Sequence, residues 1–420
     1  MKKRKLLFTL ICLLLVFGCC LVSCKKDPDT PGETKKPEES TTDNGGDPEN
    51  PGGDETKELT ETVYSLAQVT DNLRISGRHT VIPAGITCDH AASGIEFNAY
   101  CKGDVRLKLE SNGETYFSVW IDGIRKSNRI HAADGESTVT IARYLAEGEH
   151  SIRILKQTDS RLSRTVLKEL DLTGRLEAPP AERPLYIEFI GDSITSGYGN
   201  LTSGKPTDVG SSLYEDATQS FAFLAAEALN ADCSLVSCAG IGVVQGYVDF
   251  NISDFYPCTS YYRDRSVKFT AGRIPDVVVI NLGTNDLSKK ADAQEFSAGV
   301  KALTDSVHSL YGDDVPIVWA YNMMNEGNST LVRSLFRTLG GEAAGYFSVA
   351  LGRDTAGGNS HPSLEGHKTS AGILTGYLKD KGFADGTWKQ RIEVLPALVG
   401  EKEGKGWSLT WEDGFSKENN

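Results

Sequence analysis

The stretch LYIEFIGDS, from Leu185 to Ser193, decides the fold of the C-terminal region. It predicts an apolar strand that runs directly into a Gly-Asp-Ser turn, where glycine lets the backbone turn without a Cβ clash. The sequence after it alternates between two kinds of element, with helices expected at 219–229, 292–311 and 363–379 and strands at 234–237, 277–280 and 316–320. Strands that are apolar on both faces belong in a parallel sheet covered by helices. We therefore predict an α/β/α domain over residues 184–382, with its ligand site at the carboxyl ends of the strands.

The region before it, residues 59–178, follows a different pattern. Short runs of alternating apolar and polar residues, for example at 94–100, 105–109 and 116–121, are separated by turn signals such as Asp122-Gly123. Regularly spaced short strands are typical of a β-sandwich, and we expect a jelly-roll-like one. No residues in it have catalytic spacing, so a scaffold or substrate-shaping role is favoured over that of a carbohydrate-binding module. The predicted fold class is therefore a two-domain chain, a β-sandwich followed by an α/β/α domain with a parallel sheet.

The first residues predict export from the cell. A positive segment, Lys2 to Lys5, precedes an apolar run from Leu6 to Leu21, and Leu21-Val22-Ser23-Cys24 ends that run with small residues before a cysteine. This box resembles the lipobox of bacterial lipoproteins, which implies that residues 1–23 are a signal peptide and that Cys24 is the lipidation site. The alternatives are an ordinary signal peptide and a membrane-spanning anchor, although a spanning helix needs roughly 20 apolar residues and this run is shorter.

Residues 24–58 are expected to form a disordered acidic tether. The stretch from Lys25 to Lys57 contains no aliphatic, aromatic or sulfur-containing residue, so it cannot form a core. A lipid, a tether and then folded domains predict a bacterial protein held at the outer membrane or cell surface by its lipid alone. In that oxidising compartment Cys88 and Cys101 are the pair we expect to form a disulfide, because they fall in the same short-strand region.

Composition restricts the partners of the chain. Its 420 residues carry a formal net charge of −13, which argues against nucleic acid and polyanionic partners, because a phosphate backbone needs a basic face. The histidines are scattered without metal-ligand spacing, so neither a metal nor a cofactor is predicted. Residues 383–420 contain Trp388, Trp407 and Trp411 but no clear period, and no structure is predicted for them.

Four short motifs follow the expected strands or precede the last helix. Ser193 ends the Gly-Asp-Ser turn, and His361 precedes the last helix. Between them, Gly240 and Asn285 each follow one of the expected strands. Acyl transfer needs a nucleophile, a base to take its proton, and donors for the charge that builds on the carbonyl oxygen. Each motif alone is more often a plain turn or a helix cap, whereas all four in this order predict an esterase site.

The order Ser, Gly, Asn, His resembles that of the SGNH, or GDSL-type, hydrolases over about residues 184–381. The added β-sandwich, the Gly-Asp-Ser-Ile-Thr form of the first motif and the His-Pro-Ser form of the last are similar to family two of the carbohydrate esterases. Members of that family remove acetyl groups from plant polysaccharides such as xylan. The resemblance implies that Ser193 is the nucleophile and His361 the general base. It also implies an oxyanion hole formed by the backbone amides of Ser193 and Gly240 with the Asn285 side chain.

The sequence departs from the wider superfamily at the third member of the catalytic triad. An aspartate is usual three residues before the histidine, where this chain has Gly358. Either Asp354 reaches the imidazole around a glycine-rich loop or a backbone carbonyl orients it, and we favour the carbonyl. The predicted activity is removal of O-acetyl groups from a polysaccharide such as xylan through an acyl-enzyme. A lipase-like esterase or thioesterase and a non-catalytic glycan-binding lipoprotein are the alternatives.

Overall fold

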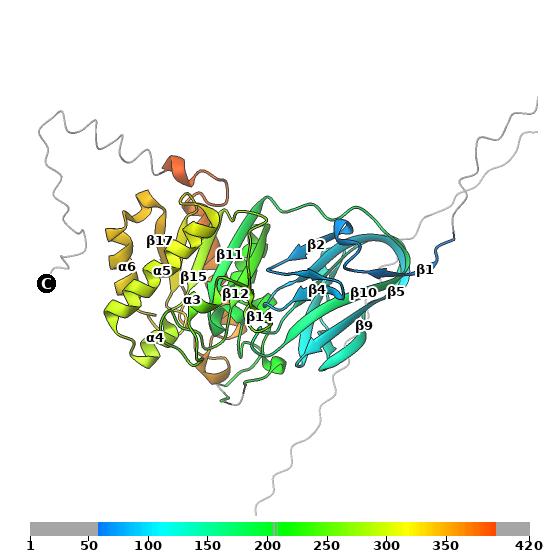
Figure 1. Cartoon of the computed structure of the whole chain (residues 1–420), viewed down its shortest axis with the longest axis horizontal. Helices are drawn as coiled ribbons and strands as arrows, with labels where there is room; N and C mark the ends of the chain where they lie inside the picture. The colour runs from blue at the N-terminus through cyan, green and yellow to red at the C-terminus, as the bar shows by residue number, and fades with distance from the viewer. Residues whose placement is uncertain (1–57, 205, 208, 392–420) are drawn as a thin grey trace, which may run out of the picture. The chain divides into compact units, whose positions relative to one another are not determined.

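The computed structural model describes residues 58–204, 206–207 and 209–391 (Figure 1). Cys24, the predicted signal peptide and nearly all of the predicted tether lie outside these residues, as do Trp407 and Trp411. No helix in the described part is long and apolar enough to cross a membrane. The described chain forms an antiparallel β domain followed by an α/β/α domain.

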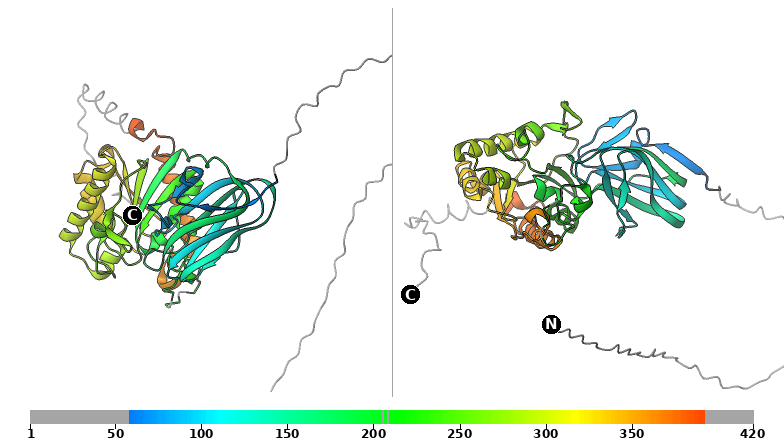
Figure 2. Two further views of the ribbon diagram at one scale, coloured as in Figure 1. Left: turned by 45° about the vertical axis from the view of Figure 1, so that its right-hand side comes forward. Right: turned by 90° about the horizontal axis from the view of Figure 1, so that it is seen from below.

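The β domain is one curled antiparallel sheet (Figure 2). Its strands in the described region are β1 (Glu61–Ser65), β2 (Leu73–Ser76), β3 (Val81–Ile82), β4 (Gly85–Cys88), β5 (Gly94–Asn112), β6 (Thr115–Ile121), β7 (Ile124–Arg125), β8 (Ile130–Ala132), β9 (Gly135–Lys156) and β10 (Arg164–Leu176). Strands β5 and β9 run for 19 and 22 residues and pair along most of their length. The predicted antiparallel β domain is confirmed. Its described strands form one curled sheet built on two long strands, and the jelly-roll-like form of the predicted β-sandwich is not confirmed.

The expected disulfide between Cys88 and Cys101 is wrong, because both thiols are free and buried. Cys88 pairs with Thr165, whereas Cys101 pairs with Gly174, nine residues farther along β10. At about 3.3 Å per residue, this separation is roughly 30 Å along the strand. A disulfide requires Cα atoms within about 7 Å, so the sheet keeps the two thiols apart.

The α/β/α domain contains the predicted parallel sheet. Its strands are β11 (Leu185–Gly191), β12 (Ala231–Ser237), β15 (Val277–Asn281), β16 (Ile317–Tyr321) and β17 (Tyr346–Ala350), in the order β12-β11-β15-β16-β17. The helices α2 (Phe221–Ala228) and α7 (Leu364–Asp380) pack on one face, and α3 (Ile252–Phe255), α5 (Ala293–Tyr311) and α6 (Ser329–Thr338) pack on the other. Along β15, Val277 and Val279 join the first layer of core residues, while Val278 and Ile280 join the second. This division explains why the strand is apolar throughout.

Shorter elements lie between the strands and helices of both domains (Figure 1). They are α1 (Ser193–Ser196), α4 (Thr284–Lys289), the hairpin of β13 (Cys258–Ser260) and β14 (Asp264–Lys268), and the 3₁₀ turns η1 (Thr70–Asn72), η2 (Ser212–Tyr214), η3 (Ala217–Gln219), η4 (Gly341–Ala344) and η5 (Gly358–Ser360). The domain also continues past its predicted end at residue 382. Phe383 and Trp388 pack on Phe347 of β17, with ring centroids 5.0 and 6.1 Å away. The first residues of the C-terminal extension therefore belong to the core.

The two domains share buried contacts. The ring centroids of Trp120 in β6 and Phe223 in α2 lie 5.9 Å apart, and both residues belong to the same apolar cluster as the parallel sheet. Arg78, from the β domain, forms an ion pair with Glu188 of β11, and both side chains are fully buried. The β domain is thus packed against the α/β/α domain through charged as well as apolar contacts.

Candidate active site

Ser193 lies where β11 ends and α1 begins. The Asp192 side chain caps α1 by accepting a hydrogen bond from the amide of Ile194 at 2.9 Å. A Cβ atom on Gly191 would lie 2.0 Å from the Thr195 hydroxyl, so the turn requires glycine at this position. The sharp turn presents the serine at the carboxyl end of the sheet, where α/β proteins bind their ligands.

His361 comes from the opposite end of the domain and meets Ser193. Its Nε2 lies 2.8 Å from the Ser193 Oγ, and its Nδ1 lies 3.2 Å from the carbonyl oxygen of Asn359. In the neutral tautomer that fits both contacts, Nδ1–H donates to the carbonyl and Nε2 accepts the serine proton. The imidazole is therefore arranged to act as a base toward this hydroxyl.

A backbone turn, and not a carboxylate, orients the imidazole. Asn359 and Ser360 have left-handed φ values of 49° and 57°, and this turn brings the Asn359 carbonyl back onto the ring. Asp354 faces the first turn of α7, where it accepts hydrogen bonds from the Ser363 amide at 3.2 Å and from the Ser363 hydroxyl. Since both ring nitrogens of His361 already have partners, the structure brings Ser193 and His361 together without Asp354.

The environment of His361 disfavours the protonated ring. Burial lowers its pKa below the ordinary value, and the hydrogen bonds with the Asn359 and Gly358 backbone only partly oppose this shift. The Tyr198 ring packs against the imidazole, with centroids 4.6 Å apart. A neutral imidazole is the form that accepts a proton, so the lowered pKa extends toward acid pH the range in which His361 can act as a base.

The three predicted oxyanion donors lie at the same edge of the sheet as this pair. Gly240 follows β12 with a φ of 88°, and Asn285 lies in α4 directly after β15. Among the described residues, the amides of Ser193 and Gly240 donate to no other protein group. The Asn285 Nδ2 donates to the Ile241 carbonyl at 2.7 Å and lies 3.4 Å from Asp192 Oδ2. Since β12, β11 and β15 are neighbours, all three donors lie at one edge of the sheet.

Two buried carboxylates support the site in roles that the sequence did not indicate. Asp286 accepts hydrogen bonds from the amides of Val243, Val244 and Gln245 at 2.8 to 3.0 Å, which fixes the loop after Gly240. Burial raises the pKa of Asp192 to about 7, and the Asp286 carboxylate adds to this shift. Asp192 lies in the Gly-Asp-Ser motif and Asp286 in the Gly-Thr-Asn-Asp motif. These positions were the only signal in the sequence that either acid belongs to the site.

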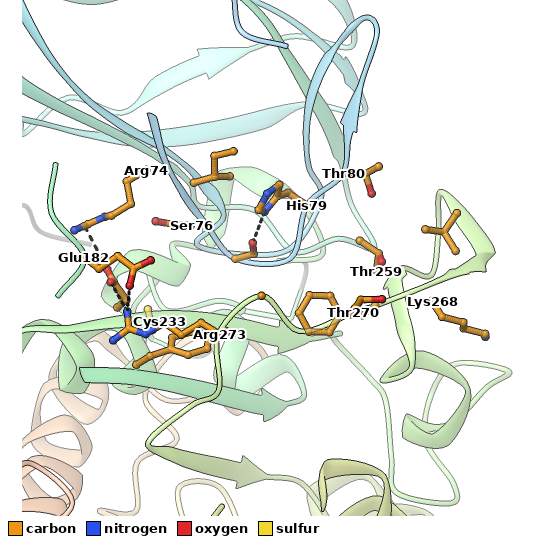
Figure 3. Close-up of a pocket in the computed structure, with 17 residues that line it drawn as sticks. Arg74, Ser76, His79, Thr80, Glu182, Cys233, Thr259, Lys268, Thr270 and Arg273 are labelled. Atoms are coloured by element: carbon orange, nitrogen blue, oxygen red, sulfur yellow. Dashed lines mark hydrogen bonds and ion pairs between the residues drawn. The ribbon is translucent and has the colours of Figure 1, made fainter. Parts of the chain in front are cut away.

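A cavity of about 590 Å³ lies at the opposite edge of the same sheet (Figure 3). It is lined by Tyr186, near the start of β11, and by Asp232, near the start of β12. Asp232 forms ion pairs with Arg74 at 3.3 Å and with Arg273 at 3.0 Å, so the arginines of this cavity are largely neutralised. The cavity is separated from Ser193 by the length of β11 and holds none of the predicted site residues.

The Ser–His pair at the carboxyl ends of a parallel α/β/α sheet, with Gly240 and Asn285 beside it, places the domain in the class of SGNH-type hydrolase folds. Residues 189–369 match the GDSL-like Lipase/Acylhydrolase family, and residues 75–180 match the Carbohydrate esterase 2 N-terminal family. The chain thus carries both domains and is homologous to the family 2 carbohydrate esterases.

Individual relatives agree with this assignment. The cellulase/esterase CelE of Acetivibrio thermocellus is 31% identical over 315 residues, 71% of this chain and 38% of CelE. An acetylxylan esterase / glucomannan deacetylase of Cellvibrio japonicus is 27% identical over 56% of this chain and 66% of its own length. This chain therefore spans less than two thirds of either curated relative. A solved family two carbohydrate esterase from Clostridium thermocellum, in complex with cellohexaose, has a TM-score of 0.67 and 29% identity, and the match covers 74% of this chain and 99% of that one.

Proposed function

We propose that the protein removes O-acetyl groups from a polysaccharide, xylan or a similar hemicellulose, through an acyl-enzyme on Ser193. The observation that carries the proposal is the 2.8 Å contact between His361 Nε2 and Ser193 Oγ at the strand ends. The names of the relatives, acetylxylan esterase and glucomannan deacetylase, support the choice of reaction and substrate class.

The proposed mechanism uses only side chains and amides already described. Ser193 Oγ attacks the ester carbonyl carbon while its proton passes to His361 Nε2. The resulting oxyanion accepts hydrogen bonds from the amides of Ser193 and Gly240 and from the Asn285 carboxamide. The C–O bond to the sugar breaks as His361 returns the proton to the sugar oxygen. Water, deprotonated by the same histidine, then attacks the acyl-enzyme, and acetate leaves with Ser193 regenerated.

The test compares the native chain with Ser193→Ala. We expect release of acetate from acetylated xylan by the native protein and a loss in kcat on the order of 10⁴-fold or more in the variant, with an unchanged circular dichroism spectrum. Ser297→Ala, on α5, is the matched control. We also expect kcat/KM for acetyl esters to exceed that for octanoyl esters by about tenfold or more, which is about 1.4 kcal/mol. Equal rates on both esters, with no acetate from any polysaccharide, would favour the lipase-like or thioesterase alternative, and full activity of Ser193→Ala would exclude this nucleophile.

We propose further that a lipid on Cys24 holds the protein at the bacterial outer membrane or cell surface, with no membrane contact other than this lipid. The support is the Leu21-Val22-Ser23-Cys24 box and the acidic composition of residues 25–57. Expression of Cys24→Ala should move the protein from the membrane fraction to the soluble fraction. Continued sedimentation of this variant with membranes would rule out the lipid as the anchor.

A further inference from the structure

The loop after β9, in the β domain, reaches the oxyanion loop of the hydrolase-like domain. Asp159 is fully buried, and its Oδ2 accepts hydrogen bonds from the Ala239 amide at 3.1 Å and from the Ser196 hydroxyl of α1. The Asp159 amide in turn donates to Glu215 Oε1 at 2.8 Å, which fixes the loop itself. A single carboxylate from the β domain thus joins the segment that carries Ser193 to the segment that carries Gly240.

Arg161, two residues farther along this loop, holds the next group of the same backbone. Its guanidinium NH1 donates to the Ala239 carbonyl oxygen at 3.2 Å, and a Cβ atom on Gly240 would lie 3.5 Å from this nitrogen. The Ala239 carbonyl and the Gly240 amide belong to one planar trans peptide, so they point in opposite directions. A donor that fixes the carbonyl therefore also fixes the direction of the Gly240 N–H.

Gly240 needs such a restraint. Its φ of 88° is in a region that glycine enters freely, so the peptide before it can rotate at little conformational cost. The Gly240 carbonyl is held separately, by the Tyr247 amide at 2.7 Å. The Ala239 carbonyl oxygen also accepts a weak hydrogen bond from the Cys238 thiol at 3.8 Å, so Arg161 supplies the shorter and charged donor to this oxygen. A positive charge on the carbonyl side also polarises the peptide, which makes its N–H a stronger donor.

We propose that Arg161 is a positioning residue for the oxyanion hole. It fixes the Ala239–Gly240 peptide so that the Gly240 amide points at the oxygen of the tetrahedral intermediate. The proposal rests on the proposed function, which makes Gly240 an oxyanion donor. It gives the β domain a part in the reaction that acts through the Gly240 amide, beyond that of a scaffold or a glycan-binding module.

The experiment compares Arg161→Met, which removes the donor at similar length, with Arg161→Lys, which keeps a charged donor. Loss of one oxyanion donor lowers kcat by about 10²- to 10³-fold, and misorientation of one should reach at least about tenfold. We expect kcat of Arg161→Met to fall by at least about tenfold, with KM changed by less than about threefold. An alkylboronic acid adds to Ser193 as a tetrahedral anion, and its affinity should fall by a factor similar to that for kcat. Arg161→Lys should recover most of kcat. Arg175→Met is the charge-matched control and should match the native protein, because Arg175 is an exposed arginine that pairs with Glu177 and packs on the Tyr100 ring.

Crystal structures of the native protein and Arg161→Met give a readout that does not depend on turnover. In the variant, the Ala239–Gly240 peptide should rotate or occupy two orientations. The proposal would be overturned if kcat of Arg161→Met lay within about threefold of the native value. It would also be overturned if KM alone rose, as expected for a direct substrate contact. Either result would leave the esterase function standing. If the native protein hydrolyses no ester, the proposed function fails, and the crystal structures still decide the positioning role: a rotated peptide supports it and an unchanged peptide overturns it.

Discussion

At the scale of single residues, His361 contacts the Ser193 hydroxyl and a backbone carbonyl, and no carboxylate among the described residues bonds to its ring. A triad aspartate holds the imidazole in one tautomer and stabilises its protonated form. Here the Asn359 carbonyl, 3.2 Å from Nδ1, supplies the first of these functions. A neutral carbonyl does little to stabilise the protonated ring. Burial therefore has the largest effect on the pKa of His361, which lies below its ordinary value.

This arrangement predicts the pH dependence of hydrolysis. The base is active only when His361 is neutral, so kcat/KM should fall on the acid side with a midpoint equal to the pKa of the free enzyme. With the pKa of His361 lowered, that midpoint should lie below about 6.5, the ordinary value for histidine. The measurement is kcat/KM for an uncharged acetyl ester between mildly acidic and neutral pH. A midpoint at or above the ordinary value would show that an anion acts on the ring.

The residues of the site differ in how far the sequence could predict them. Ser193, Gly240, Asn285 and His361 could be predicted to meet, because the carboxyl ends of neighbouring parallel strands lie at one edge of a sheet. Arg161 could not, because it comes from the other domain and its contact with Ala239 depends on how the two domains pack. No local pattern of residue types records such a contact.

At the scale of elements, Asp354 belongs to the start of α7. It accepts from the Ser363 amide and hydroxyl, and Ser363 is the N-cap residue whose hydroxyl accepts the Gly366 amide. Burial acts to raise the pKa of Asp354, but the hydrogen bonds from Ser363 and from the Ala356 amide outweigh it, so the pKa lies below its ordinary value. The carboxylate therefore stabilises the folded state above its unfolded pKa, and this contribution is lost as the pH falls through the lower folded-state pKa.

The variant Asp354→Asn should therefore change stability more than catalysis. We expect kcat to fall by less than about tenfold, whereas loss of a triad carboxylate costs about 10⁴-fold. The free energy of unfolding in urea at neutral pH should fall by about 0.5 to 2 kcal/mol, as for the loss of a helix cap. Asp380→Asn, at the other end of α7, should leave both quantities nearly unchanged. A thousandfold drop in kcat with unchanged stability would restore Asp354 to a triad.

The strand boundaries of the β domain were harder to predict than those of the α/β/α domain. The segments at 94–100 and 105–109 were expected as separate strands, and both belong to β5. Gly103, with a φ of 79°, lies between register shifts in the pairing with β9, so the chain passes a bulge and continues the strand. A glycine between two apolar runs is the same signal for a bulge and for a turn, and only the pairing partner decides between them.

At the scale of the whole molecule, a buried ion pair joins the two domains. Arg78 lies within 3.2 Å of Glu188, and Glu188 also accepts hydrogen bonds from the hydroxyls of Tyr256 and Tyr311 at 2.8 and 2.9 Å. The guanidinium packs on the rings of Tyr256 and Phe269, 4.6 and 4.1 Å from their centroids. Removal of one partner would leave an uncompensated charge in the interior, so we expect the domains to unfold together.

Replacement of Arg78 tests this coupling. Arg78→Met should lower the free energy of unfolding by about 3 to 5 kcal/mol, the usual result of breaking a buried pair. The double variant Arg78→Met with Glu188→Gln should recover part of that loss. Arg106→Met, whose side chain is 42% exposed in pairs with Glu61 and Asp171, should lose at most about 1 kcal/mol. Calorimetry of the native protein should give one transition, and two separated transitions would contradict the coupling.

The buried thiols have a further consequence for the chemistry of the folded chain. In the described residues, Cys88, Cys101, Cys233, Cys238 and Cys258 are all free and buried. Burial raises the pKa of Cys88 to about 12 and that of Cys101 to about 11. Because alkylation and disulfide exchange proceed through the thiolate, the native fold protects Cys88 and Cys101 from both. The rate at which a maleimide labels each cysteine therefore reports how often the part of the fold around that cysteine unfolds locally.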